Sequence, residues 1–267
     1  MTHLFPDLSE SDGAIGRPDS DKSSYVLRLA DDALVYAQRL GGWIASAPQL
    51  EEDVALGNIA LDQLGQARSL LTYAGELEGR GRDEDALAYF RDERDFVNAQ
   101  VFELERGDFG FTIARMLVIG SYQLELYTRL QASTDGTLAA IAAKAVKEVD
   151  YHRDHATQWA VRLGDGTDES HRRVQQGLDD VWPYVAELFE SDELVAALSA
   201  RGVAVDPAAL EEPVLSYVAA TMAEATLDAP ETSVRHTGGR RGIHTEQLGY
   251  LLAEMQHVAR SHPGAQW

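Results

Sequence analysis

The side chains of this sequence best suited to chemistry are a few carboxylates and one histidine: Asp62, Glu125, Glu148 and His152. Oxygen and nitrogen ligands of this kind suit iron. A four-helix bundle that holds two irons takes a Glu from each of two helices and a Glu-x-x-His from each of the other two. The i, i+3 spacing places carboxylate and imidazole on one inward helix face. A di-iron centre is therefore the chemistry to test.

The ligand set is incomplete. Val149 precedes His152 by three positions and Glu148 precedes it by four, while Gly65 follows Asp62 by three. One interpretation is an active di-iron oxidase or oxygenase with atypical ligand spacing. The other, which we favour, is a chain that holds no metal, with a buried His152 hydrogen-bonded to a carboxylate such as Glu148 or Asp62.

Two further His-containing motifs are weaker candidates for metal. Glu254 and His257 form a true Glu-x-x-His, but the motif occurs once and lies on a short C-terminal helix. His152 and His155 have a spacing that zinc can use, but no third ligand is evident.

The segment 237–244, Thr-Gly-Gly-Arg-Arg-Gly-Ile-His, is the one Gly-rich basic stretch. Its backbone N–H groups, with Arg240 and Arg241, could bind a phosphate or a partner's carboxylate. The alternative is an ordinary loop whose arginines pair with local acids. The segment lacks the Gly-x-x-x-x-Gly-Lys pattern of a nucleotide-binding loop. The charged run 91–95 is expected to be a solvated, self-paired face.

Composition excludes several classes of function. The 267 residues hold 44 Asp and Glu against 23 Lys and Arg, a net charge of −21, and no cysteine. Such acidity disfavours nucleic acid and anionic membrane surfaces as partners. The absence of cysteine removes disulfides, thiolate nucleophiles and Cys-ligated clusters. No export signal or membrane-spanning run is apparent, so we expect a cytoplasmic protein.

The elements that would position these residues are all helices. Residues 49–182 contain no proline and are rich in good helix formers. Apolar residues recur at spacings of three and four, which predicts long helices over 24–45, 51–78, 109–131 and 137–163. Shorter helices are expected near 96–104, 169–189 with a break at Pro183, 191–201, 207–225 and 245–260. We therefore predict an all-α, ferritin-like four-helix bundle with additional C-terminal helices. It would form a single domain over 24–267 after a flexible acidic tail over 1–23.

Several segments also carry a family resemblance. They are Leu61-Asp62-Gln63-Leu64-Gly65-Gln66-Ala67-Arg68, Arg91-Asp92-Glu93-Arg94, residues 144–152, residues 162–167, residues 242–246 and residues 252–256. In their order and spacing, from about Tyr25 to Trp267, the chain resembles the structural C subunits of bacterial phenylacetyl-CoA epoxidases, also called ring 1,2-phenylacetyl-CoA monooxygenases.

The resemblance implies a multicomponent monooxygenase of aerobic phenylacetate catabolism. In that family the di-iron centre belongs to a catalytic subunit, and a reductase subunit delivers electrons from NADPH through FAD and an iron–sulfur cluster. The structural subunits are metal-free paralogues that pair with the catalytic one. The resemblance thus implies a non-catalytic structural subunit without a cofactor of its own. It also suggests CoA phosphate as one anion for Arg240 and Arg241.

Overall fold

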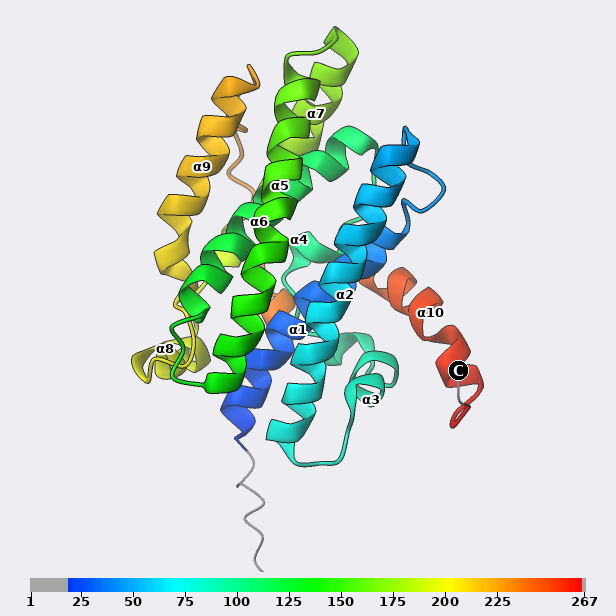
Figure 1. Cartoon of the computed structure of the whole chain (residues 1–267), viewed down its shortest axis with the longest axis vertical. Coiled ribbons are helices and arrows are strands. Elements are labelled where there is room, and N and C mark those ends of the chain that lie inside the picture. Colours follow the sequence, from blue (N-terminus) through cyan, green and yellow to red (C-terminus); the bar gives the residue numbers. More distant parts are fainter. Residues whose placement is uncertain (1–18, 266–267) are drawn as a thin grey trace, which may run out of the picture.

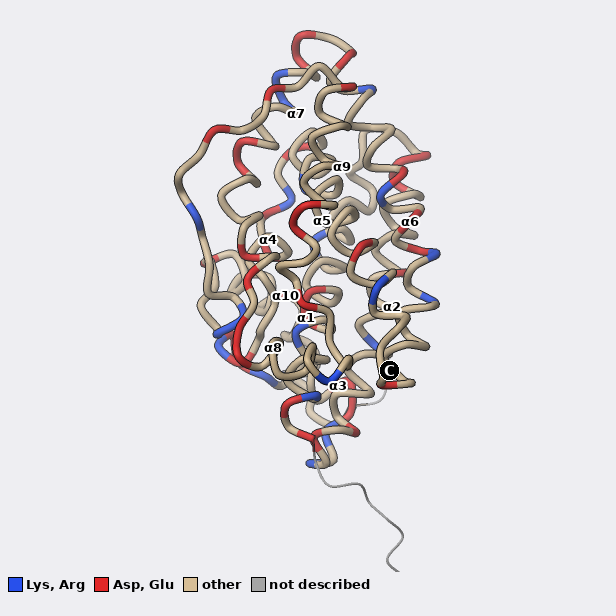
Figure 2. The backbone as a smooth tube through the Cα atoms, turned by 90° about the vertical axis from the view of Figure 1, so that its left-hand side faces the viewer, with Lys and Arg blue, Asp and Glu red and all other residues tan. Residues whose placement is uncertain are grey.

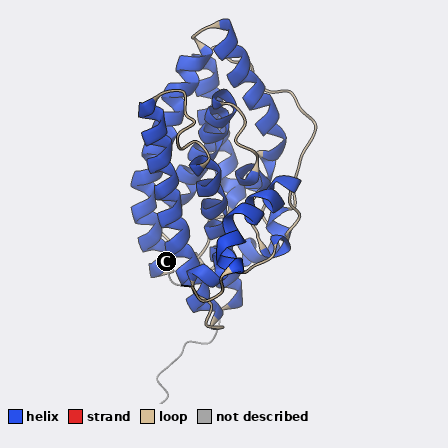
Figure 3. Cartoon of the chain, turned by 90° about the vertical axis from the view of Figure 1, so that its right-hand side faces the viewer, coloured by secondary structure: helices blue, strands red, loops and turns tan. Residues whose placement is uncertain are grey.

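Residues 19–265 of the computed structural model are described here, and they form only helices and connecting loops (Figures 1 and 3). The predicted all-α class is confirmed. The α-helices are α1 (Ser20–Gly41), α2 (Leu50–Glu78), α3 (Glu84–Tyr89), α4 (Gln100–Glu103), α5 (Phe109–Leu130), α6 (Gly136–Gly164), α7 (Asp168–Val181), α8 (Glu193–Ala200), α9 (Glu211–Glu224) and α10 (Glu246–Ser261). Short 3-10 turns are η1 (Glu93–Asp95), η2 (Trp182–Tyr184), η3 (Ala186–Phe189), η4 (Pro207–Leu210) and η5 (Gly239–Arg241).

Four long helices form the ferritin-like bundle. α1 packs along α2, α5 packs along α6, and α2 and α6 join the two pairs. Trp43, which follows α1, donates from Nε1 to Thr112 Oγ1 of α5 at 3.0 Å and meets the Phe109 ring edge-on. The long connection between the pairs, residues 79–108, carries α3 and α4 and packs against α1, where it contacts Asp31 and Asp32.

α5 is the central helix of the molecule. It contacts α6, α7 and α9, and 17 of its 22 residues are buried. A helix that is covered all round has no polar face to present to water, which explains its apolar sequence from Met116 to Ile119. Figure 1 shows α7 and α9 beside this core, and α10 crossing the opposite side of the bundle.

Two predicted boundaries of the first helix were wrong. The helix begins at Ser20 rather than Ser24, because the Asp19 side chain accepts a hydrogen bond from Lys22 N and caps the first turn. It ends at Gly41 rather than Ala45, and Ile44 is 64% exposed in the turn that follows. Residues 1–18 of the predicted tail lie outside the described residues.

The other long helices match their predicted spans to within one residue at each end. The predicted break at Pro183 is confirmed, since α7 ends at Val181 and two 3-10 turns follow. None of the helices among residues 19–265 is long and apolar enough to cross a membrane.

Candidate functional site

The centre of the bundle holds a buried polar cluster between α2, α5 and α6. Gln63 and Gln123 exchange two amide hydrogen bonds, at 2.9 and 3.0 Å. Gln63 Nε2 also lies 3.5 Å from His152 Nδ1, and His152 Nε2 lies 3.0 Å from Asp62 Oδ2. An amide NH₂ can only donate, so Nδ1 accepts and the Nε2–H of His152 donates to Asp62. The predicted hydrogen bond between a buried His152 and a carboxylate is thus present, and Asp62 is the carboxylate.

Glu148 lies beside this cluster and has partners of its own. Gln66 Nε2 donates to Glu148 Oε2 at 3.0 Å, and Lys144 Nζ lies 3.6 Å from Oε1. Glu125 forms an ion pair with Arg129 one turn along α5, at 3.5 Å. Among residues 19–265, Glu125 shares no hydrogen bond or ion pair with Asp62, Glu148 or His152. The four sequence candidates therefore do not form one site.

The residues at the centre do not fit a metal pair. No group of three or more His, Asp or Glu side chains within residues 19–265 lies close enough to hold a metal ion. The inward positions are filled by Gln63 and Gln123; each NH₂ group donates to the Oε1 of the other residue, and an NH₂ group cannot coordinate a cation. Val149, three residues before His152, is fully buried and offers no ligand atom.

Gly65, three residues after Asp62, does not face the centre of the bundle. A Cβ at Gly65 would lie 4.0 Å from Lys144 Nζ, whose side chain is 69% exposed. Position 65 is therefore on the outer side of α2, and a histidine there would not point into the bundle. Gln63 and Gln66 are the buried polar residues of this turn.

A second His–carboxylate pair joins the same two helices. His155 Nε2 lies 2.8 Å from Glu52 Oε2, and both side chains are 9% exposed. His152 and His155 thus contact different carboxylates, Asp62 and Glu52, rather than one shared centre. Both pairs connect α2 to α6 by side-chain bonds where the two helices meet.

Arg240 is largely buried, with 15% of its side chain exposed. Its guanidinium forms two hydrogen bonds of 2.8 Å with Asp32 and one of 3.1 Å with the Val97 carbonyl. Burial acts to lower the pKa of Arg240, but the adjoining Asp32 carboxylate raises it on balance. Burial raises the pKa of Asp32 to about 6, against the opposing charge of Arg240, so the pair is ionised at neutral pH. The acid it contacts belongs to α1, not to the local loop, while the neighbouring Arg241 is exposed. Of the two candidate anion ligands, only Arg241 faces solvent.

The loop that carries Arg240 is bound to the segment before α4 by buried acids. Glu187 accepts from the backbone N–H groups of Gln100, Gly238 and Gly239 at 2.6–2.8 Å. Glu103 accepts from Thr245 N at 2.6 Å and lies 2.7 Å from His244 Nδ1.

The interpretation of the run 91–95 was wrong for Arg91. It is 3% exposed and forms a bidentate ion pair with Asp31 of α1. An isolated run of alternating charges gave no sign that its first residue contacts a helix 60 positions earlier.

Comparison with known proteins now adds to the geometry. The family model described as phenylacetic acid catabolic protein matches residues 7–267. The chain belongs to this family. It is also similar to the Escherichia coli K12 protein named as the C subunit of 1,2-phenylacetyl-CoA epoxidase, with 50% identity over 245 residues, or 92% of this chain and 98% of the relative.

This phenylacetic acid catabolic protein has the Gln63–Gln123 amide pair at the centre of its bundle, where other four-helix bundles hold metal ligands. Sequence reasoning found His152 and Asp62 but missed Gln63 and Gln123. The one signal in the sequence was a glutamine at position 123, between Tyr122 and Leu124 of the expected helix 109–131, because a polar residue on a buried face requires a partner.

Proposed function

We propose that this chain is a non-catalytic structural subunit of a multicomponent di-iron monooxygenase that epoxidises phenylacetyl-CoA. In this proposal it pairs with the catalytic subunit and stabilises it. The observation that carries the proposal is the reciprocal amide pair of Gln63 and Gln123 at the bundle centre. It occurs in a chain that is 50% identical to a named epoxidase subunit.

The centre of the bundle presents neutral amides rather than metal-binding carboxylates. Two carboxamides that donate to each other stabilise the core and supply no negative charge to a metal ion. His152 has both ring nitrogens engaged, one by Gln63 and one by Asp62. Binding iron would break these contacts and leave buried polar groups unpaired, which costs about 1–3 kcal/mol for each group.

The proposal assigns electron transfer to other subunits. Because the chain has no cysteine, it cannot ligate an iron–sulfur cluster through thiolates. The reductase that carries FAD and the cluster would therefore pass electrons to the catalytic subunit, with this chain as a scaffold.

Reconstitution of the complex tests this proposal. The catalytic subunit and reductase are assayed for NADPH-dependent epoxidation of phenylacetyl-CoA with and without this chain, and the chain is analysed for iron by itself. We expect activity or the stability of the catalytic subunit to rise when the chain is added, and the chain alone to hold almost no iron. A content of about two irons per chain would contradict the proposal, since that is the content of a working di-iron bundle.

The variant Gln123→Leu distinguishes a structural role of this chain from a catalytic one. Gln123→Leu removes half of the central amide pair, so a chain that used this centre for turnover would lose kcat. A scaffold that still folds would leave kcat of the complex unchanged. Circular dichroism of the purified variant establishes that it is folded.

A further inference from the structure

α2 carries apolar residues on two opposite faces. The inner face, buried against α1 and the rest of the bundle, includes Leu56, Ala67, Leu70 and Ala74. On the outer face Leu50, Val54, Leu61 and Leu64 are 74%, 57%, 65% and 40% exposed. A helix at the surface of a monomer needs one apolar stripe, and a second stripe is expected when a further contact covers it.

Two glycines lie on the same outer line, and no contact among residues 19–265 explains them. A Cβ added at Gly57 would meet nothing within 4 Å, and one at Gly65 would meet only Lys144 Nζ at 4.0 Å. Elsewhere in the helices, interior glycines mark close internal approaches, as at Gly177 of α7, where a Cβ would lie 2.6 Å from Phe111 Cα. Glycine inside a helix is less stable than alanine. Gly57 and Gly65 therefore suit the close approach of something outside this chain.

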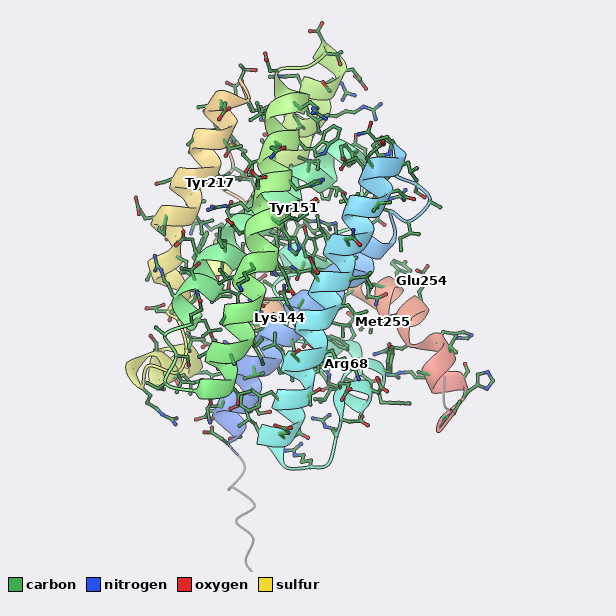
Figure 4. The ribbon with its side chains drawn as sticks, in the orientation of Figure 1. Arg68, Lys144, Tyr151, Tyr217, Glu254 and Met255 are labelled. Carbon is green, nitrogen blue, oxygen red and sulfur yellow. The ribbon has the colours of Figure 1, made fainter. Side chains whose placement is uncertain are left out.

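The same surface carries positive charge in a strongly acidic chain. The sequence has only three lysines, and Lys144 and Lys147 both lie on the exposed side of α6. Tyr151 follows them on α6 and is 52% exposed. Figure 4 shows Lys144, Tyr151 and Arg68 of α2 on one side of the molecule.

We call this surface the α2–α6 face, formed by Leu50, Val54, Leu61 and Leu64 of α2 with Lys144 and Tyr151 of α6. We infer that it binds the helical bundle of the catalytic subunit. The contacting helices of the catalytic subunit would place apolar side chains over Gly57 and Gly65, and carboxylates opposite Lys144 and Lys147. This inference rests on the proposed function and names the surface through which it operates.

The size of the face suits a stable complex. A helix of 29 residues, the length of both α2 and α6, is about 43 Å long and about 10 Å wide. Two such helices side by side offer on the order of 800 Å², which is the share of one partner in a standard protein interface. The lysines would counter the repulsion that a partner's carboxylates meet from a chain of net charge −21.

Leu61→Asp is the direct test, and Tyr250→Asp is its matched control. Leu61 is 65% exposed on α2 and Tyr250 is 66% exposed on α10, so both changes put a carboxylate on an exposed apolar site of a helix. Binding of each full-length variant to the purified catalytic subunit is measured by titration calorimetry. We expect Leu61→Asp to weaken binding roughly 30-fold or more, the effect of losing one interface hot spot. Tyr250→Asp should leave the Kd unchanged.

A second variant acts by size rather than charge. Gly57→Leu places a good helix former where a Cβ meets nothing in the free chain, so the melting temperature of the isolated protein should stay the same or rise. If the partner helix approaches here, the same change weakens binding. A variant that is more stable alone yet binds worse cannot be explained by misfolding.

The possible results lead to different conclusions. If the wild-type chain does not bind the catalytic subunit, the proposed function itself is wrong. If the wild type binds and Leu61→Asp binds equally well, or if only Tyr250→Asp weakens binding, the assignment of the α2–α6 face is wrong. If Leu61→Asp instead converts a wild-type homodimer to a monomer without changing the Kd for the catalytic subunit, the face binds a second copy and the inference is overturned.

Discussion

At the scale of single residues, the buried carboxylates of this chain act as hydrogen-bond acceptors that position loops. Asp31 accepts from Val97 N and Asp32 from Ala99 N, both at 2.9 Å. A buried carboxylate is stable only where cations or several N–H donors surround it, and each of these acids has such partners. Each of these two acids of α1 thus binds both an arginine and a backbone N–H group of the connection before α4.

The ionisation of His244 gives a prediction at this scale. Both ring nitrogens face oxygen acceptors, Glu103 Oε2 at 2.7 Å and the Phe96 carbonyl at 2.8 Å, so both must carry protons. Burial acts to lower the pKa of His244, but the hydrogen bond and charge of Glu103 outweigh it and raise the pKa above its ordinary value. We therefore expect the pair to stabilise the fold below about pH 6.5, the pKa of an unfolded histidine, and to lose this contribution as pH rises through the raised folded pKa.

Urea unfolding of the wild type and His244→Gln across pH 6 to 9 measures this contribution. The difference in unfolding free energy between the two proteins should be largest at the acidic end and shrink toward pH 9. His262→Gln, a change at an exposed histidine, should follow the wild type at every pH. A difference that grew with pH would show that His244 is neutral in the folded protein.

The candidate site was predictable only in part. The spacing of His152 within an apolar stripe was enough to predict a buried histidine with a carboxylate partner. Gln123 could not be assigned, because a glutamine has the same appearance in a sequence whether it faces another amide, a metal-bound water or solvent. Its role depends on Gln63, which lies 60 residues earlier and on another helix.

At the scale of elements, the long helices were predictable because each repeats its own apolar spacing. α5 was expected over 109–131 and spans Phe109–Leu130, and α6 was expected over 137–163 and spans Gly136–Gly164. The connection before α4 and the loop before α10 were not predictable, because their contacts are with each other. Gln100 Nε2, for example, donates to the Ile243 carbonyl at 2.8 Å across 143 positions of sequence.

Gly239, in the loop before α10, gives the prediction at the scale of elements. A Cβ at Gly239 would lie 2.2 Å from the Asn98 carbonyl oxygen, and neither backbone segment can move without losing the hydrogen bonds to Glu187. We expect Gly239→Ala to lower the free energy of unfolding by about 3 kcal/mol, as overpacking of a rigid contact does.

Denaturant unfolding checks this value, with Gly41→Ala as the control because a Cβ there meets nothing within 4 Å. The control should stay within about 0.5 kcal/mol of the wild type. Equal effects of the two changes would mean that the loop is not held against residues 98–100 as described.

At the scale of the whole molecule, the charged residues fall into exposed surface ion pairs and buried ion pairs. Figure 2 shows acidic residues spread over the backbone from end to end. Many ion pairs at the surface, such as Arg172 with Glu169 at 2.9 Å, are exposed on both sides and contribute little. The buried pairs, Arg91 with Asp31 and Arg240 with Asp32, are shielded from salt by the protein around them.

The melting temperature should depend on salt, because salt screens the exposed charges but not the buried ion pairs. The net charge of −21 makes the compact chain repel itself, and this repulsion acts over distances that salt screens. Raising sodium chloride from about 0.01 to 0.1 M shortens the Debye length from about 30 to 10 Å, so long-range repulsion weakens while the buried pairs persist. We therefore expect the melting temperature of the isolated chain to rise over this range, measured by circular dichroism at neutral pH. Glucose at equal osmolality serves as an uncharged control and should not reproduce the salt-specific part of the rise. A melting temperature that fell with salt would mean that surface ion pairs, rather than net repulsion, dominate the electrostatics of the fold.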